Sequence, residues 1–526
     1  MKTKSNQLKI SALLTFAIAV FALTFGISTA AQEQDNQRQR VIGTPAITPT
    51  PRNDQSITAL QSQIRFILSR NELQRGQVGV KIVDLNTSRL VYETNGEKYF
   101  MPASNMKSYT VAAAIERLSP NFRFSTSVYA PAMPNESGNL KGNLTIYGRG
   151  DVSFSTAFYD GDYYKGLDAL AEKIVQAGIK KIEGDLIGDD SYFSGNPTPF
   201  TWEWDDMQWN WGVEISALNV NNNSVDLSVK PSSVGAPCNV LLLPASPVFK
   251  IQNTCVTSAN GTPRNLKVTK KLEQNILEIS GSMPAGDKTY TGYIAVSRPA
   301  EMFIALLRQS LEKKGVVITG RNSLINPKAK YFSQTAPIEI AKIESAPLSI
   351  IAQKTMKPSQ NMFTETLLWT LGEQLGDKTK PNLSSAERGI GVVSNFLTQV
   401  GIASDAVKQY DGSGLSRHNL ITPNSAVQLY TFMSKSRYAQ AWNDSLTIGG
   451  IDGTLRNRFK NTKAAGNVRG KTGTIDQVSA LSGYVTTDAG EKVVFSIIIN
   501  GVAETSIRQA VIDEIVVALA NFNGRF

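Results

Sequence analysis

The pattern of strands at the two ends of this chain constrains its fold more than any other feature. Near the C-terminus, three strand-like runs follow one another: 470–475, 480–487 and 492–500. Asp488-Ala489-Gly490 provides a turn before the third run, and residues 506–520 carry apolar side chains on one face of a helix. Near the N-terminus, residues 78–85 alternate as a strand, and residues 90–92 continue as its hairpin partner. Together the two ends predict one α/β (α+β) domain that is interrupted by an insert.

The middle of the chain has a different sequence pattern from its two ends. From about residue 126 to residue 330, short β-like runs alternate with Gly, Asn, Pro and Asp turns, and few helical patterns interrupt them. After the insert, helical spacing returns in residues 348–357 and 361–375. We therefore expect a discontinuous domain built from residues 56–125 and 336–526, with one or two mainly β domains inserted over residues 126–335.

The first 31 residues have the character of an export signal. Lys2, Lys4 and Lys9 precede an apolar run over residues 10–27, and Ser28-Thr29-Ala30-Ala31 supplies small residues for cleavage. An uncleaved membrane anchor is the alternative, because the run is nearly long enough to span a bilayer. Residues 32–55, rich in Gln, Asn, Pro and Thr, are predicted to form a disordered linker. We expect a periplasmic or cell-envelope protein with no transmembrane span once the signal is cleaved.

The charge of the chain limits the kinds of partner that it is expected to bind. The net charge of +10 falls to +7 when the three signal lysines are removed. A basic surface suits an anionic polymer or a lipid face, although an ordinary solvated surface is the simpler explanation. No dense Lys/Arg block with interleaved aromatic residues occurs, so nucleic acid is not an expected partner.

Two cysteines, Cys238 and Cys255, are present. Export makes a disulfide between them plausible, and two unpaired buried thiols are the alternative. One histidine and two cysteines at this spacing cannot supply four ordinary zinc ligands. We expect neither a metal nor a cofactor.

Ser104 and Lys107 form the first candidate catalytic pair. They lie three residues apart at the start of a strong helical pattern, so both side chains share one face of the first turn. A lysine desolvated there could take the serine proton, and the helix N-terminus favours developing negative charge. A capping serine and a surface lysine are the alternative. Ser310 and Lys313 match the same spacing late in a charged helix, where we expect a structural role.

Two further motifs follow. Ser359 and Asn361 present a hydroxyl and an amide in a loop between helices, whereas similar Ser-x-Asn matches in the insert are turn sequences. Lys471-Thr472-Gly473-Thr474 occurs once. Its lysine supplies positive charge, its threonines can donate hydrogen bonds to a terminal carboxylate, and its glycine would let a substrate backbone approach the strand. A strand weakened by glycine is the alternative for this motif alone.

Other hydrolase templates do not fit. The chain contains no G-x-S-x-G sequence, so the nucleophile elbow of an α/β-hydrolase is absent. The single histidine, His418, lies in a polar loop, where we expect a structural hydrogen bond rather than a catalytic base.

The order S-x-x-K, S-x-N, K-T-G resembles the signature of the penicillin-recognising serine enzymes. The large insert between the first two motifs is similar to that of class C low-molecular-mass penicillin-binding proteins, the penicillin-binding protein 4 type D-alanyl-D-alanine carboxypeptidase/endopeptidases. Residues 148–151, 411–420 and 452–455 also resemble that family. The resemblance covers residues 56–526 and implies a serine transpeptidase-like domain, an antiparallel sheet flanked by helices, with a large mainly β insert.

The resemblance also implies roles. Ser104 would be the acyl-ester nucleophile and Lys107 its proton acceptor. Ser359 and Asn361 would complete the proton relay and hold the acyl group. The substrate-binding residues would be Lys471, Thr472 and Thr474 for the terminal carboxylate, the N–H groups of Ser104 and Thr474 for the oxyanion, and Asp151 for the free amine of the stem-peptide diamino acid. Arg149 replaces the small residue expected beside Asp151.

The implied reaction is hydrolysis of peptidoglycan stem peptides through an acyl-enzyme, with β-lactam antibiotics as inhibitors. A serine β-lactamase and a non-catalytic peptidoglycan-binding protein remain alternatives. The sequence leaves open the balance of carboxypeptidase and endopeptidase activity, the oligomeric state and the role of the insert.

Overall fold

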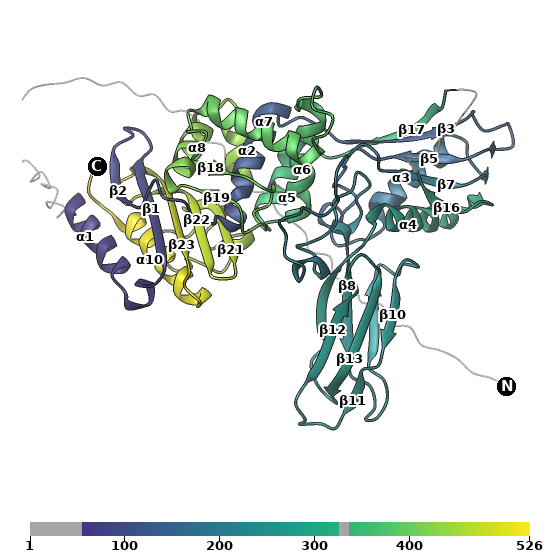
Figure 1. The fold of residues 1–526 in the computed structure, drawn as a ribbon, viewed down its shortest axis with the longest axis horizontal. Helices are drawn as coiled ribbons and strands as arrows, with labels where there is room; N and C mark the ends of the chain where they lie inside the picture. The colour runs from purple at the N-terminus through teal and green to yellow at the C-terminus, as the bar shows by residue number, and fades with distance from the viewer. Residues whose placement is uncertain (1–54, 326–335) are drawn as a thin grey trace, which may run out of the picture. The chain divides into compact units, whose positions relative to one another are not determined.

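The computed structural model describes residues 55–325 and 336–526 (Figure 1). The predicted export signal and all but the last residue of the predicted linker lie outside the described residues. In the described part, no helix combines the length and the apolar character needed to cross a membrane.

A six-stranded sheet organises the peptidase part of the chain. All its neighbouring strands are antiparallel, and strands from both ends of the chain meet in it. In sheet order the strands are β2 (Leu90–Thr94), β1 (Gln77–Asp84), β23 (Lys492–Asn500), β22 (Val478–Thr486), β21 (Arg469–Ile475) and β20 (Thr447–Ile448). The predicted C-terminal strand run and N-terminal hairpin are therefore confirmed, and so is one sheet shared by both ends.

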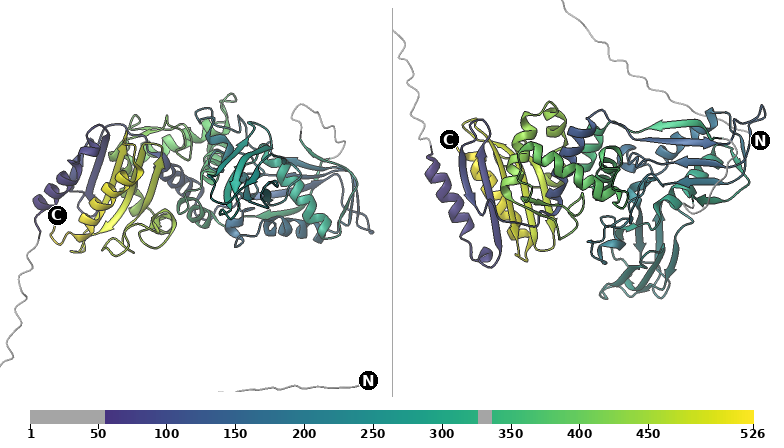
Figure 2. Two further views of the ribbon diagram at one scale, coloured as in Figure 1. Left: turned by 90° about the horizontal axis from the view of Figure 1, so that it is seen from below. Right: turned by 45° about the horizontal axis from the view of Figure 1, so that its top comes forward.

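Alternation along the strands explains why both faces of this sheet are covered by helices. In β23, Phe495 and Ile497 belong to one buried cluster and Val494 and Ile498 to another. Successive side chains of a strand point to opposite faces, so a continuous apolar run requires cover on both sides. The first cluster packs under helices α1 and α10, which lie side by side on one face of the sheet (Figures 1 and 2).

The remaining helices build the opposite layer. They are α2 (Met106–Leu118), α5 (Leu348–Met356), α6 (Asn361–Leu375), α7 (Ser385–Val400), α8 (Pro423–Lys435) and α9 (Ala439–Ser445). The first layer consists of α1 (Ile57–Leu68) and α10 (Thr505–Asn521). The two-stranded pair β18 (Val407–Lys408) and β19 (Leu420–Ile421) brackets a loop that reaches the site. The central helix α2 is buried from Met106 to Ile115, because its Ala-rich sequence lets neighbouring helices approach closely.

The insert has its own hydrophobic core and is mainly β, as predicted. A five-stranded sheet contains β16 (Asn322–Leu324), β7 (Leu186–Asp189), β5 (Leu144–Tyr147), β3 (Ser125–Ala130) and β17 (Ile338–Glu344). A short sheet contains β15 (Val317–Ile318), β6 (Lys181–Glu183) and β4 (Asn139–Lys141). Helices α3 (Lys165–Gln176) and α4 (Pro299–Lys313) pack with these strands, and α4 buries Ser310 in a structural position.

Two further sheets complete the insert. They contain β14 (Tyr290–Ala295), β8 (Ser224–Lys230) and β9 (Asn239–Leu243), and β10 (Lys250–Asn253), β13 (Ile276–Pro284), β11 (Val256–Ser258) and β12 (Asn265–Lys270). Cys238 and Cys255 form a disulfide with their Cα atoms 5.4 Å apart. β17 pairs with β3 across the predicted boundary at residue 335, which stays a prediction.

Candidate active site

Ser104 and Lys107 meet at the start of α2. Ser104 lies in a single 3-10 turn, Ala103–Asn105, that runs directly into the helix, and Ala103 adopts a left-handed φ of 47°. The Lys107 Nζ atom lies 2.9 Å from the Ser104 Oγ atom. The three-residue spacing thus brings the two groups into hydrogen-bonding distance, as predicted.

Two further contacts determine how the Lys107 amine can direct its hydrogens and its lone pair. Its Nζ atom donates to the Oδ1 atom of Asn361 at 2.6 Å and to the main-chain oxygen of Ser413 at 2.7 Å. The Asn361 amide is oriented by its Nδ2 atom, which donates to the Trp211 oxygen at 2.8 Å. Both acceptors of Lys107 are therefore carbonyl oxygens that cannot donate. A neutral amine would give its two hydrogens to them and turn its lone pair to the Ser104 hydroxyl.

The surroundings favour that neutral amine. The Lys107 side chain is fully buried, and this burial lowers its pKa to about 7, against the opposing pull of Asp411 and Glu365. Removal of water disfavours the charged form of a lysine. A base with a pKa near neutrality is also well matched to proton transfer at physiological pH.

Glu365, which the sequence analysis did not single out, shapes this environment from α6. It is fully buried and accepts hydrogen bonds from the main-chain N–H groups of Gly412 at 3.0 Å and Ser413 at 2.7 Å. Burial, followed by the charge of Asp411, raises its pKa to about 8. Glu365 thereby fixes the loop that presents the Ser413 oxygen to Lys107. An acid one turn beyond Asn361, in the apolar first part of this helix, was the available signal.

Asp411 anchors the other side of the same loop. Its two carboxylate oxygens accept from the N–H groups of Gly414 at 2.7 Å and Ser416 at 2.6 Å, from the Asn419 side chain at 2.7 Å and from the Trp202 indole at 2.9 Å. These contacts give a structural reason for the polar residues Asp411 and Asn419 in the stretch that resembles a family motif, because both hold the loop in shape.

A second buried lysine sits at the other end of the site. The Lys471 Nζ atom donates to the Ser359 Oγ atom at 2.8 Å and to the main-chain oxygen of Thr472 at 2.9 Å. Burial, with repulsion from Lys107, holds its pKa well below the ordinary value. Ser359 occupies the turn between α5 and α6 with a left-handed φ of 64°, which aims its hydroxyl at this lysine. The structure thus brings together one residue from each of the three motifs.

The strand β21 presents the rest of the K-T-G motif. The Thr472 hydroxyl bonds to the Thr454 hydroxyl at 2.7 Å, and Thr474 is exposed. Among the described strands, the short β20 pairs only with Arg469 and Gly470, so the edge of β21 beyond Gly470 has no strand partner. An unpaired edge can accept an extended peptide by β-augmentation.

Gly473 is required for a reason that differs from the predicted one. A Cβ atom there would lie 2.3 Å from the main-chain oxygen of Pro102 and 3.2 Å from the Cβ atom of Ala103. Gly473 therefore lets β21 pack directly against the turn that carries Ser104. Its predicted role, approach of the substrate backbone, stays a prediction.

Asp151 lies apart from this group of contacts. Its side chain is 2% exposed, and its Oδ1 atom accepts from the N–H group and the hydroxyl of Ser153 at 2.7 and 2.6 Å. Burial raises its pKa to about 6. Arg149 bonds to Ser127 at 2.8 Å and lies over the ring of Tyr147. This bonding favours a structural role for Asp151, and its predicted contact with a substrate amine stays untested.

A loop of the insert reaches the site. It supplies the Trp211 oxygen to Asn361 and contains Glu203 and Asp206, whose carboxylates lie 3.0 and 3.5 Å from the guanidinium of Arg417. Within residues 55–325 and 336–526, the one group of three acids close enough to share a cation is Glu203, Asp205 and Asp206. Arg417 already neutralises two of these acids. Sequence reasoning missed this loop because it lies 150 residues from Asn361 along the chain.

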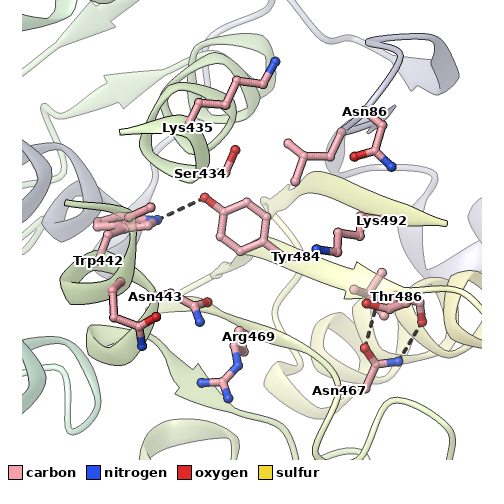
Figure 3. A pocket seen from close by; sticks show the side chains of 14 residues that line it. Asn86, Ser434, Lys435, Trp442, Asn443, Asn467, Arg469, Tyr484, Thr486 and Lys492 are labelled. Atoms are coloured by element: carbon pink, nitrogen blue, oxygen red, sulfur yellow. Dashed lines mark hydrogen bonds between the residues drawn. The ribbon is translucent and has the colours of Figure 1, made fainter. Parts of the chain in front are cut away.

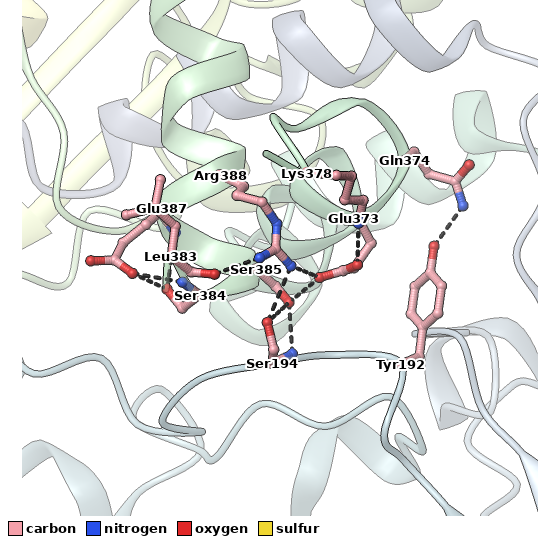
Figure 4. A network of polar contacts seen from close by, with 10 residues as sticks. All are labelled: Tyr192, Ser194, Glu373, Gln374, Lys378, Leu383, Ser384, Ser385, Glu387 and Arg388. Atoms are coloured by element: carbon pink, nitrogen blue, oxygen red, sulfur yellow. Dashed lines mark hydrogen bonds and ion pairs between the residues drawn. The ribbon is translucent and has the colours of Figure 1, made fainter. Parts of the chain in front are cut away.

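A partly buried polar network ties the insert to the helices behind the site (Figure 4). Arg388 of α7 pairs with Glu373 of α6 and donates to the Ser194 hydroxyl at 3.1 Å, and Ser385 accepts from the Ser194 N–H group at 2.7 Å. Beside it, Gln374 contacts Tyr192 at 2.5 Å. Because α6 carries both Asn361 and Glu365, these contacts support the position of the site. His418 is exposed and packs edge-on against Tyr410, with ring centroids 5.4 Å apart.

Comparisons with known proteins agree with this geometry. Residues 60–522 match the model of the D-Ala-D-Ala carboxypeptidase 3 (S13) family. The chain is 33% identical to the D-alanyl-D-alanine carboxypeptidase of Actinomadura sp. (strain R39), over 89% of this chain and 86% of that protein. It is 27% identical to the D-alanyl-D-alanine carboxypeptidase DacB of Haemophilus influenzae, over 81% of this chain and 85% of that protein.

A solved structure is similar over nearly the whole fold. The crystal structure of penicillin binding protein 4 from Haemophilus influenzae superposes with a TM-score of 0.74 at 25% sequence identity, covering 88% of this chain and 99% of that chain. A second crystal structure of that protein, complexed with a β-lactam, gives a TM-score of 0.68 at 24% identity, covering 86% and 97%. The antiparallel sheet flanked by helices, with its mainly β insert, is thus the penicillin-recognising fold. The chain belongs to the D-Ala-D-Ala carboxypeptidase 3 (S13) family.

Proposed function

We propose that this D-Ala-D-Ala carboxypeptidase is an exported serine enzyme that works through an acyl-enzyme on Ser104 and also cleaves D-Ala–diamino acid cross-links. The observation that carries the proposal is the arrangement around Lys107. Two carbonyl acceptors hold a desolvated amine 2.9 Å from the Ser104 hydroxyl, so that a neutral amine would have its lone pair left for that hydroxyl. Such an amine accepts the serine proton as the Ser104 oxygen attacks the D-Ala carbonyl carbon.

The other predicted residues have consistent roles in the same step. The N–H groups of Ser104 and Thr474 would stabilise the oxyanion of the tetrahedral intermediate. Lys471, assisted by the hydroxyls of Thr472 and Thr474, would bind the terminal carboxylate. Ser359, bonded to Lys471 at 2.8 Å, would pass a proton to the leaving amine. Loss of the C-terminal D-Ala, or of the cross-linked peptide, leaves an ester on Ser104, and water then releases the acyl group.

The charged residues near the insert loop suggest which part of the protein contacts the diamino acid of the substrate. The predicted amine contact of Asp151 would require it to leave a buried, bonded position. Asp206 and Arg417 are partly exposed and lie in the loops that bond to Asn361 and follow Asp411. A side chain with both an amine and a carboxylate would find complementary charge there. We infer that this pair, with Glu203, contacts the diamino acid of the stem peptide.

Benzylpenicillin and a stem pentapeptide test the function. The intact mass of the protein mixed with benzylpenicillin should show a lasting one-to-one adduct, supported by the β-lactam complex of the H. influenzae relative. The Ser104→Ala variant should show no adduct and no D-Ala release, with an unchanged circular dichroism spectrum. Rapid penicillin loss without an adduct would indicate a β-lactamase instead. Both carboxylate oxygens of Glu365 accept main-chain N–H groups, from Gly412 and Ser413, and this structural role argues against Glu365 as the deacylating base of a β-lactamase.

A further inference from the structure

A cavity of roughly 640 Å³ lies beside the first residue of β21 (Figure 3). Arg469 of β21, Tyr484 of β22 and Lys492 of β23 line it from the sheet, and Lys435 of α8 and Trp442 of α9 line it from the helices. Of the described residues that line it, none belongs to the acylation machinery above. The cavity is therefore a separate candidate binding site.

The charged residues that line the cavity are all positive. Lys435, Arg469 and Lys492 contribute cations, and none of the described residues that line the cavity is Asp or Glu. Elsewhere in the peptidase part, Arg458 forms an ion pair with Asp513. By contrast, the three cavity cations form no ion pair within residues 55–325 and 336–526. Cations of one sign in a concavity with low-dielectric walls focus a positive potential that attracts anions.

The remaining lining suits a hydroxyl-rich ligand. Within residues 55–325 and 336–526, the side-chain amides of Asn86 and Asn443, which line the cavity (Figure 3), form no hydrogen bond, so they are available to a ligand. The Tyr484 hydroxyl is already used, because it accepts from the Trp442 indole at 3.0 Å and donates to the Tyr430 oxygen at 2.6 Å. Its ring therefore offers carbon surface at the centre of the cavity (Figure 3). Amides for hydroxyls and an aromatic ring for C–H groups are the contacts a sugar needs.

We propose that this cavity binds an anionic saccharide, a sugar or short glycan that carries a carboxylate or phosphate group. Arg469 and Lys492 hold the anion, the free amides bond to hydroxyl groups, and Tyr484 packs against the apolar face of the ring. The volume lies within the range of small-molecule sites, about 300–1,000 Å³. Arg469 and Tyr484 are only partly exposed, so a planar lipid surface would meet them less well than a single sugar unit.

Arg469 also connects the cavity to the active site. It lies two residues before Lys471 on the same face of β21, and its register partner across the strands is Tyr484. The Tyr430 hydroxyl, beyond Tyr484, bonds to Ser108 at 2.9 Å, next to Lys107. The inference nevertheless concerns binding and does not require Ser104 to be active, so it can fail or succeed independently of the proposed function.

Calorimetric titration of the full chain tests the proposal with defined probes. N-acetylmuramic acid, which carries a carboxylate, should bind at low salt, and N-acetylglucosamine, its neutral relative, should bind at least about tenfold more weakly. Added salt should weaken the binding, because partly exposed charges are screened. The same affinity is expected for the Ser104→Ala variant and for protein acylated by benzylpenicillin.

Matched variants locate the site. The double variant Arg469→Gln/Lys492→Gln should lose about tenfold or more in affinity, because two charged donors are removed. The control Lys408→Gln/Lys460→Gln removes two exposed charges elsewhere and should stay within about twofold. Penicillin acylation rates and melting temperatures report whether both variants fold. If the first does not fold, Lys435→Gln, an exposed position, should still weaken binding several-fold.

Several results would overturn the proposal. Equal binding of the neutral sugar, equal affinity of the double variant, or loss of binding on acylation would each place the ligand elsewhere. Inorganic phosphate binding as tightly as the sugar acid would reduce the cavity to a simple anion site. Binding of phosphatidylglycerol vesicles but not of the sugar acid, with the same sensitivity to Arg469→Gln/Lys492→Gln, would assign the cavity to lipid headgroups instead.

Discussion

The rate of acylation should depend on pH through the protonation of Lys107. Burial brings the pKa of this amine to about 7, and its neutral form is the proposed base. For a single titration, the neutral fraction is about one tenth at pH 6, about half at pH 7 and about nine tenths at pH 8. An ordinary lysine would be neutral in well under about one molecule in a thousand at pH 7. Desolvation thus raises the reactive fraction on the order of a thousandfold.

The assay is the acylation rate constant at saturating benzylpenicillin, followed by intact mass or tryptophan fluorescence from pH 5 to pH 10. Saturation removes the effect of Lys471 on carboxylate affinity. We expect a rate that rises about tenfold per pH unit below pH 6 and reaches a plateau above pH 8. A control run at each pH without ligand verifies that the protein stays folded.

Two results would refute the reasoning. A rate that keeps rising tenfold per unit up to pH 10 would mean that the pKa of Lys107 is close to its ordinary value despite its burial. A rate that is flat from pH 5 to pH 9 would mean that Lys107 is not the base. Loss of acylation in Lys107→Arg, whose guanidinium stays charged, would complete the test.

Three other perturbations have definite expectations. Glu365→Gln places an NH2 group against one of the two N–H donors it now accepts from, so the free energy of unfolding in urea should fall by about 1–3 kcal/mol and acylation should slow. Gly473→Ala forces β21 away from the turn that carries the nucleophile, and the acylation rate should fall by about tenfold or more. The control Gly391→Ala lies exposed in α7 with open space at its Cβ position, and it should stabilise the protein by about 0.5–1 kcal/mol. Replacing Cys238 and Cys255 by serine opens a link with a sequence separation of 17, which should cost about 3 kcal/mol in urea denaturation.

Local patterns predicted the secondary structure well in the peptidase part. The boundaries of α6 and β23 agree with the expected ranges, because each has a clear period and a turn or cap at its end. Long-range strand pairing was harder to predict. The strand at 338–344 pairs with β3, more than two hundred residues earlier in the chain, and no local pattern records such a partner.

The residues of the candidate site also separate into those that the sequence could predict and those that it could not. Ser104 and Lys107 could be paired from sequence because helical geometry alone brings residues three apart together. Glu365, the Ser413 oxygen and the Trp211 oxygen could not be found in this way. Glu365 lies on α6, but its role depends on a loop further along the chain whose N–H groups it accepts from. The Ser413 and Trp211 oxygens lie in loops from distant parts of the chain, and they are main-chain atoms that any residue would supply.

The sequence by itself determined the order of the three motifs, the elements that carry them and the contact between the serine and the lysine of the first motif. Those properties depend on periodicity and on neighbours within one helical turn. Only the tertiary structure decided the lowered pKa of Lys107, the carbonyl acceptors of its amine and the close approach of Gly473 to the turn that carries Ser104. Each of these depends on removing water and on placing carbonyl groups from residues 254 and 306 positions away, which only the packed fold brings together.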